Sequence, residues 1–536
     1  MTEPTPLPPG PSRIAKQAAA RDAAEPPPGT IVCTPGYLDD AVQAVGRALA
    51  ASASALGLYQ HGDTLTRVAE ADDTERPGIS RAPGSPVLRP VDNACLAVYI
   101  SRVCELVRWD GRKNDYSAID PPRRVVDGVA SIADRFGFPD LRGFISAPIV
   151  TPDGRVIAAP GYDEATGLYL AAALPLPPTP DSPTKLDASA ALDYLAADIL
   201  GTFAQTWATP ADESAAVAAI LTVLLRRILP TAPIVAIDAT TPGSGKTLLA
   251  EVFATIATNR PPALVSLTRD AAETEKRIGA VLMAGDAVIN HDNLSFPLRS
   301  DIHCQMATAP EVALRVLGAS RVTRVPTNVA TLITGNNLTL LGDLPRRVLR
   351  IGLDPRCEHP ERRRFDRDAV AHARAHRAAA VAAALTLVRA YLIAGAPDVG
   401  VTPYGSFELW DRMVRRPVVW AGFPDPLDAA ADLSSQDHEL TAVADLLAAW
   451  HDQYGDRPMT APEVIRDAEA QLMTGQTRHQ ALADAIQEAT GHRQTDARAL
   501  GNLLRGYAGR WLDGRRVVKG KKSRAGMSWA VEVNRV

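Results

Sequence analysis

The stretch ATTPGSGKTLLAE, residues 239–251, has the residue types of a phosphate-binding loop. The strict pattern G-x-x-x-x-G-K-S/T asks for glycine where this chain has Thr240. An apolar strand pattern, APIVAID, precedes the loop, and a helix pattern, KTLLAEVFATIA, follows it. We therefore predict an ATP site. Lys246 would reach the β- and γ-phosphates, Thr247 would ligate Mg²⁺, and backbone N–H groups would cradle the phosphates around Pro242, Gly243, Ser244 and Gly245.

A P-loop needs an acidic partner for the metal, and the segment DAVINHDN supplies one. Asp292 ends a short apolar strand about 45 residues after the loop, and its oxygen suits a hard cation such as Mg²⁺. Asn293 follows, where many such ATPases carry a glutamate base. Because an asparagine takes no proton, we expect Asn293 to orient the attacking water at most.

Two further groups follow the next apolar segments. Asn336 ends the strand pattern NVATLITGNN, where it would sit beside the γ-phosphate; a turn residue is the alternative. Arg346 and Arg347 precede one more strand, in GDLPRRVLRIGLD. In an oligomer one of them could act as an arginine finger on a neighbour's γ-phosphate, the alternative being a solvated basic pair.

The composition of the chain indicates what kind of protein must position these residues. The 536-residue chain is 46% hydrophobic and 22% charged with a net charge of −4, which is typical of a folded, multidomain protein whose nucleic-acid surface, if any, is local. The five cysteines are scattered, which argues against a zinc ribbon and fits a reducing cytoplasm. The N-terminus lacks the pattern of a signal peptide, so we expect a cytoplasmic protein without a membrane partner.

We predict an α/β fold with an ATPase core between two smaller domains. The expected parts are a Pro/Ala-rich tail (1–30), a mixed α/β N-terminal domain (31–173), a proline-rich linker (174–186), an ATPase domain with a helical lead-in (187–395), a connector (396–440) and a C-terminal domain (441–536).

The sequence of the C-terminal domain predicts a winged helix. TAPE at residues 460–463 is a capping box that opens a first helix, and two further helices and a basic hairpin follow. The third helix has an apolar face and an opposite polar face. The candidate DNA contacts on this helix and on the wing are Arg498, Arg505, Lys519, Lys521 and Lys522. A protein-interaction module and solvated charges are the alternatives.

The order Lys246, Asp292-Asn293, Asn336 and Arg346-Arg347 resembles that of superfamily 3 helicases, a branch of the AAA+ ATPases. The segments ETEKRIGAVLMAGDAVINHDN, TGNNLTLLGDLPRRVLRIGLDP, PGYDEATGLY and SFELWDRMVRRPVVWAGFPDP resemble the helicase module of phage, prophage and mobile-element primase-helicases, from about residue 140 onward. We find no acidic metal cluster for nucleotide polymerisation in residues 1–180, so the chain resembles the helicase part without its primase.

The resemblance implies a role for residues 313–328, which read as a hairpin about Gly318-Ala319-Ser320. In that family such a hairpin projects into the channel of a hexameric ring and grips single-stranded DNA. Its cationic residues here would be Arg315, Arg321 and Arg324, with solvated arginines on a structural hairpin as the alternative.

The expected function is an ATP-dependent DNA helicase or replication-initiation ATPase of a phage or mobile element, acting as a hexameric ring. Its partners would be single-stranded and forked or origin DNA, other copies of the chain, and a separate primase or polymerase. Two alternatives stay open: a DNA-stimulated loader or remodeller without unwinding, and a non-hydrolysing DNA-binding scaffold.

Overall fold

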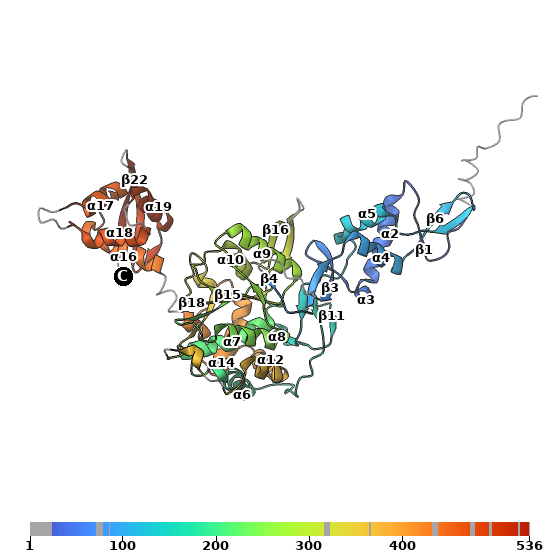
Figure 1. The fold of residues 1–536 in the computed structure, drawn as a ribbon, viewed down its shortest axis with the longest axis horizontal. Coiled ribbons are helices and arrows are strands. Elements are labelled where there is room, and N and C mark those ends of the chain that lie inside the picture. Colours follow the sequence, from blue (N-terminus) through green and yellow to red (C-terminus); the bar gives the residue numbers. More distant parts are fainter. Residues whose placement is uncertain are drawn as a thin grey trace, which may run out of the picture. The chain divides into compact units, whose positions relative to one another are not determined.

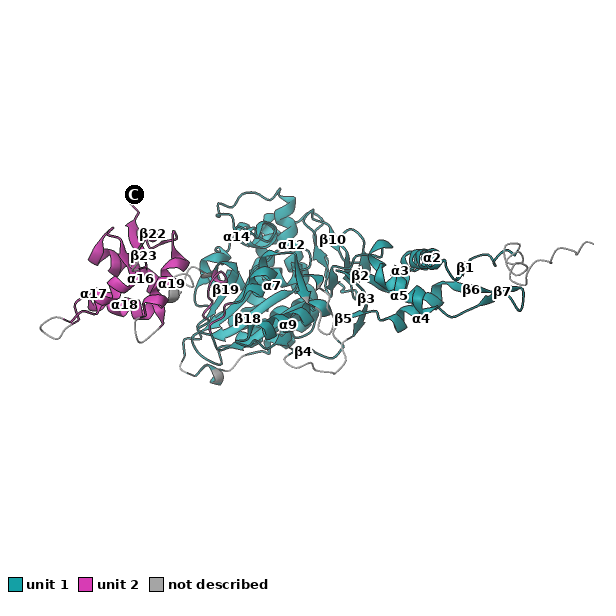
Figure 2. Cartoon of the chain, turned by 90° about the horizontal axis from the view of Figure 1, so that it is seen from above, with its two compact units in different colours: residues 1–296, 300–338, 346–429 teal, residues 297–299, 339–345, 430–536 magenta. Residues whose placement is uncertain are grey.

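The structure is a computed structural model of the whole chain. It describes residues 24–70, 79–84, 86–315, 322–357, 359–363, 366–430, 438–471, 477–491, 496–523 and 526–534. The chain forms two compact units (Figure 2). Unit 1 comprises residues 1–296, 300–338 and 346–429, and unit 2 comprises residues 297–299, 339–345 and 430–536. Each unit is described by itself.

The centre of unit 1 is a six-stranded sheet in the order β19-β13-β18-β15-β14-β4. The neighbouring strands are parallel, except that β4 runs antiparallel to β14. Their bounds are β19 (Val348–Leu353), β13 (Ile234–Ala239), β18 (Ala330–Asn336), β15 (Val288–Leu294), β14 (Ala263–Val265) and β4 (Ile79–Ser80). Because β18 lies between β13 and β15, the carboxyl ends of these three strands meet at one edge of the sheet.

Helices pack around this sheet, with α7 against β19 and α8 against β13, β15 and β18 (Figure 1). Their starts follow local capping rules: a capping box of Thr209 and Asp212 opens α7, and the Asp270 carboxylate caps α9. The helices are α6 (Lys185–Asp193), η2 (Tyr194–Ile199), η3 (Gly201–Phe203), α7 (Pro210–Leu225), α8 (Lys246–Thr258), α9 (Ala271–Ala284), α10 (Asp301–Thr308), η4 (Pro345–Arg347), η5 (Pro360–Arg362), α11 (Ala369–Ala375), α12 (Arg377–Ile393), α13 (Glu408–Trp410), η6 (Asp411–Arg415), α14 (Arg416–Ala421) and η7 (Pro426–Ala430).

The hairpin predicted at residues 313–328 is present as a two-stranded antiparallel sheet of β16 (Glu311–Arg315) and β17 (Val322–Pro326). Its predicted turn, Gly318-Ala319-Ser320, lies outside the described residues.

The N-terminal part of unit 1 has its own apolar core around α2, α4 and α5. Its elements are β1 (Thr30–Val32), α2 (Leu38–Ala51), α3 (Ala53–Leu56), β2 (Leu58–His61), β3 (Thr64–Glu70), β5 (Pro86–Pro90), α4 (Asn93–Val103), β6 (Glu105–Asp110), β7 (Asp115–Ala118), α5 (Arg123–Ser131), η1 (Ala133–Arg135), β8 (Gly143–Ile145), β9 (Ile149–Val150), β10 (Val156–Ile157), β11 (Gly161–Asp163) and β12 (Leu168–Leu170).

This N-terminal part is joined to the six-stranded sheet more closely than a linker at residues 174–186 suggests. Strand β4, from within the predicted 31–173 domain, is the sixth strand of that sheet. Beside it, Arg81 Nε and Nη2 donate to the two carboxylate oxygens of Asp286, each over 2.6 Å. A two-residue strand is too short to carry a periodic pattern, so it cannot be predicted from the sequence.

Unit 2 contains the helices and hairpin expected of the C-terminal domain. Helices α17, α18 and α19 pack with α16 and with the sheet β20-β23-β22-β21 around one apolar core. The bounds are α16 (His438–Tyr454), β20 (Met459–Thr460), α17 (Ala461–Ala468), α18 (Gln480–Thr490), α19 (Ala497–Tyr507), β21 (Trp511–Leu512), β22 (Arg515–Ser523) and β23 (Gly526–Val533). In the part of the chain that the structure describes, no single helix is long and apolar enough to cross a membrane.

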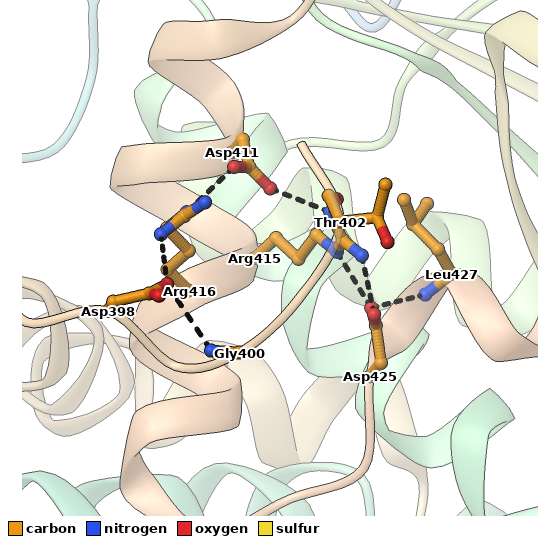
Figure 3. Close-up of polar contacts among 8 residues, drawn as sticks. All are labelled: Asp398, Gly400, Thr402, Asp411, Arg415, Arg416, Asp425 and Leu427. Atoms are coloured by element: carbon orange, nitrogen blue, oxygen red, sulfur yellow. Dashed lines mark hydrogen bonds and ion pairs between the residues drawn. The ribbon is translucent and has the colours of Figure 1, made fainter. Parts of the chain in front are cut away.

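A buried ion-pair network fixes the segment after α12 (Figure 3). The Arg415 side chain, 5% exposed, donates to Asp411 Oδ1 over 2.9 Å, to Asp425 Oδ1 over 2.8 Å and to the Thr402 carbonyl over 2.7 Å. Arg416 Nε donates to the other Asp411 oxygen over 2.8 Å. Every carboxylate of this network therefore has a cationic partner, as burial requires.

Replacing Arg415 with methionine is expected to lower the free energy of unfolding of unit 1 by about 3–5 kcal/mol, because Asp425 and Asp411 lose a buried partner. Chemical denaturation followed by tryptophan fluorescence would measure this change. Arg412→Met is the matched control, since Arg412 lies on the same turn and is exposed. Equal stability of the two variants would contradict the expectation.

Candidate nucleotide-binding and hydrolysis site

The loop between β13 and α8 has the backbone of a phosphate cradle. Gly243 and Gly245 have φ of 73° and 96°, a region that glycine enters without strain. Thr240 is not among the residues with positive φ. The first position of the motif therefore needs no glycine in this chain, which is why threonine is tolerated there.

Helix α8 begins directly after the loop and leaves its first amides available. Its N-cap is Gly245, and no side chain caps it. Uncapped N–H groups and the positive end of the helix dipole form an anion-binding site. The residues at this position thus fit a nucleotide phosphate.

Lys246 lies at the centre of the site. It is 8% exposed, and its Nζ donates to Asn336 Oδ1 over 2.6 Å and to the Thr241 carbonyl over 3.4 Å. Burial lowers the pKa of its ammonium group, while Asp238 and Asp292 oppose that shift. The strand order explains the contact with Asn336, because Asn336 on β18 is paired with Ala239, the last residue of β13.

Asp292 lies next to the other expected metal ligand. Thr247 Oγ1 donates to Asp292 Oδ1 over 2.8 Å, and Thr334 Oγ1 donates to the same oxygen over 2.7 Å. Both Asp292 and Thr247 are exposed, so a cation could reach them. A hydroxyl and a carboxylate in contact beside a phosphate cradle are a donor set that fits Mg²⁺.

Asn293 occupies an irregular point of β15. The register with β18 shifts between His291 and Leu294, and Asn293 has a φ of 53°. Asparagine tolerates this left-handed conformation better than most residues. The Asn293 backbone N–H donates to Thr334 Oγ1 over 2.9 Å, so the bulge and Thr334 together set the position of Asp292.

Three residues of the site were not identified from the sequence. Thr334 was hidden in an apolar strand pattern. Asp238, buried in β13, accepts from Leu338 N over 3.0 Å and from Arg350 Nη2 over 3.4 Å. Its carboxylate could have been singled out from the sequence, because a charged residue inside an apolar strand pattern is unusual. Glu251 follows Thr247 by one helical turn on α8, and burial, with Asp292 nearby, raises the pKa of its carboxyl group.

A cavity lies beside η3. It has a volume of about 670 Å³ and is lined in part by Gly201, Thr202, Gln205 and Arg367. Phe203, which follows Thr202 in the chain, lies against Gly245 of the loop. A Cβ on Gly245 would stand 3.3 Å from the Phe203 ring.

Arg346 and Arg347 lie away from this edge of the sheet. They form η4, directly before β19, whose first residue Val348 pairs with Ile234 at the start of β13. The loop follows the other end of β13, about 17 Å along the strand. The structure therefore does not bring these arginines together with Lys246 of the same chain.

The candidate DNA contacts fall on exposed positions where the structure describes their side chains. Arg324 is exposed on β17; Arg321 and the side chain of Arg315 lie outside the described residues. On the C-terminal unit, the exposed residues are Arg498 and Arg505 on α19 and Lys519, Lys521 and Lys522 on β22.

A chain of buried imidazoles lies behind Asp292. His291 Nδ1 lies 2.8 Å from the Val265 carbonyl and must donate to it, so its Nε2 accepts from His303 Nε2 over 3.0 Å. His303 Nδ1 then accepts from Ser300 Oγ over 2.7 Å. Both rings are neutral in this arrangement. Burial lowers the pKa of His291 to about 4 and that of His303 well below its usual value.

This pair predicts a loss of stability below neutral pH. Because each pKa is lower in the folded chain than the ordinary 6.5, the unfolded chain binds more protons as the pH falls through 6.5. We expect these two histidines to lower the free energy of unfolding of unit 1 by about 3 kcal/mol between pH 7.5 and 5.5. Denaturant titrations across this range would measure the slope. His303→Gln, which retains a donor for His291, should remove about half of this contribution; an unchanged slope would contradict the assignment.

No protein-family model and no curated protein matches this chain. Similar solved structures include the NrS-1 C-terminal region (12% identity, TM-score 0.32, covering 85% of this chain and 96% of that one). A structure titled SCCmec type IV Cch, active helicase, has 12% identity and a TM-score of 0.32, covering 89% of this chain and 97% of that one. The JCV helicase has 11% identity and a TM-score of 0.24, covering 49% and 64%. Because these TM-scores lie below 0.5, the assignment of an α/β fold with a P-loop-like site relies on this chain's own strand order and loop.

Proposed function

We propose that the chain is an ATP-dependent DNA helicase or replication-initiation ATPase of a phage or mobile genetic element. The observation that carries the nucleotide part is the meeting of Lys246, Thr247, Asp292 and Asn336 at one edge of the sheet. Lys246 would hold the β- and γ-phosphates, and Thr247 and Asp292 would hold Mg²⁺. The metal would supply charge neutralisation at the phosphates.

The remaining groups would orient the attacking water and accept its proton. Asn336, in contact with Lys246, would sense the γ-phosphate and orient the water together with Asn293. Glu251 is a carboxyl group on which the charge of Asp292 acts, and its raised pKa suits proton uptake. The cavity beside η3 would receive the base and ribose of ATP.

The DNA part of the proposal depends on the β16–β17 hairpin, the resemblance to superfamily 3 and the basic face of the C-terminal unit, which we interpret as a winged helix in the AAA+ manner. Arg346 or Arg347 would complete a neighbour's site, so the active form would be a ring, which the resemblance makes a hexamer. Hydrolysis would move the hairpin along single-stranded DNA, while the C-terminal unit binds duplex or origin DNA and a separate primase joins the complex.

The test is displacement of a labelled strand from a forked duplex with ATP and Mg²⁺, alongside the rate of ATP hydrolysis with and without single-stranded DNA. Displacement with DNA-stimulated hydrolysis would support the helicase. Stimulated hydrolysis without displacement would favour a loader or remodeller. DNA binding without hydrolysis would favour the scaffold, a reading that Asn293 keeps open.

A further inference from the structure

The turn between β2 and β3 contacts the hairpin proposed to grip DNA. We call this turn, His61, Gly62 and Asp63, the brace turn. It belongs to the N-terminal part of unit 1, whereas the hairpin is an insertion of the ATPase domain. The contacted residue, Arg324, lies on β17 in the middle of its pairing with β16.

Gly62 packs directly against the backbone of β17. A Cβ at this position would stand 1.9 Å from the Arg324 carbonyl oxygen and 3.1 Å from its carbon, so no other residue fits without displacing the strand. Gly62 also has a φ of 55°, which an L-residue adopts at a cost. This contact is with backbone atoms, which cannot move aside as the end of a flexible side chain would.

Asp63 adds a directional contact at the same point. Its Oδ2 accepts from the Arg324 backbone N–H over 3.2 Å. Strand β17 pairs with β16 on one side, and this bond occupies an N–H on its other side. An edge strand with a satisfied N–H is held in position and is protected from pairing elsewhere.

The brace turn is itself fixed to the body of unit 1. Gln60 N donates to Pro139 O over 2.9 Å, and Leu141 N donates to Gln60 O over 2.7 Å. His61 is buried, and its Nδ1 donates to Leu141 O over 2.7 Å.

The next residues along the chain also hold the base of the hairpin. Asn328, two residues after β17, donates to Arg142 O over 2.8 Å and accepts from Arg227 Nη1 over 2.7 Å. Gly62 and Asp63 thus contact the side of the hairpin, and Arg142 contacts its base.

We propose that the brace turn sets the orientation of the β16–β17 hairpin and so positions Arg324 for single-stranded DNA. The inference rests on the proposed function, since it assumes that the hairpin binds DNA. It assigns to the N-terminal part of the chain a role in coupling hydrolysis to DNA rather than in hydrolysis itself. Gly62 and Asp63 are positioning residues, because neither is expected to touch nucleotide or DNA.

The test compares Gly62→Ala with Gly57→Ala. Gly57 lies in the same part of the chain with a similar φ of 65°, but nothing stands within 4 Å of its missing Cβ. Both variants carry the same backbone strain, and Gly62→Ala alone meets Arg324. We expect basal hydrolysis within about twofold of wild type in both, and DNA-stimulated hydrolysis and strand displacement reduced about tenfold in Gly62→Ala alone.

A second pair of variants and a second measurement test the same contact independently. Asp63→Ala should behave as Gly62→Ala does, whereas Asp63→Asn retains an acceptor oxygen and should restore coupling. Hydrogen–deuterium exchange of the peptide containing Arg324 should be faster in Gly62→Ala and Asp63→Ala, without any need for activity.

The outcomes separate this inference from the proposed function. Wild type that shows no response to DNA would remove the proposed function, while faster exchange in the variants would still support the contact. Normal hydrogen–deuterium exchange and normal DNA stimulation in Gly62→Ala would overturn the proposal that the brace turn orients the hairpin. Equal loss of basal and stimulated hydrolysis would also overturn it, because the turn would then be needed for folding of the ATPase and not for coupling.

Discussion

Replacing Lys246 with alanine is expected to reduce ATP hydrolysis about a hundredfold or more. The Lys246 ammonium group is buried, contacts Asn336 and lies beside the uncapped start of α8. A cation in a partly desolvated site stabilises developing charge on the phosphates far more than an exposed one does. Phosphate release at saturating ATP and Mg²⁺ would measure the loss, and strand displacement should disappear with it.

The control for this variant is Lys276→Ala. Lys276 lies on α9 and makes an exposed ion pair with Glu273, 3.5 Å away, so its loss should leave hydrolysis unchanged. Circular dichroism and ring assembly should match wild type in both variants. Hydrolysis by Lys246→Ala within threefold of Lys276→Ala would mean that this loop does not position the reacting phosphates.

Alanine at the finger arginine is expected to lower hydrolysis by about 10³-fold, and the loss should be repairable by a different inactive variant. Arg346 and Arg347 lie at the amino end of β19, about 17 Å along the strands from the loop of their own chain. We therefore expect their effect on hydrolysis to act on a neighbouring copy. We expect either Arg346→Ala or Arg347→Ala to show it.

Mixing the inactive arginine variant with Lys246→Ala is the decisive measurement. In a randomly mixed ring about one interface in four would combine an intact Lys246 with an intact arginine, so hydrolysis should reappear. Each variant alone, at the same total concentration, is the control. Inactive mixtures from proteins that assemble normally would contradict a finger in trans, as would full activity of both arginine variants.

The positions of Lys246, Thr247, Asp292 and Asn336 could be predicted because each lies at or just beyond the carboxyl end of a buried strand, and parallel strands bring these ends together. The bulge at Asn293 could not, because it depends on register with β18, and neither could Thr334, whose hydroxyl is buried in an apolar pattern. The tolerance of Thr240 likewise depended on a backbone angle that residue types alone do not specify.

The larger surprises came from contacts between distant parts of the chain. The hairpin predicted at residues 313–328 is present, and the structure holds another at His61-Gly62-Asp63. The two hairpins contact each other through Asp63 and Arg324, which are 261 positions apart in the sequence. No local pattern predicts such a contact. For the same reason, Arg81 and its partner Asp286 could not be paired from one sequence.

Strand β4 has a consequence for how the chain can be divided. It occupies the outer edge of β14, where the sheet would otherwise present unpaired N–H and C=O groups. A fragment that starts at the proline-rich segment would lack this strand and would leave Asp286 without its guanidinium partner. An open edge of this kind is a template for pairing with other chains, so such a fragment would tend to aggregate even with every nucleotide-binding residue present. Residues 79–81 thus protect the open edge of the sheet that carries the candidate nucleotide site.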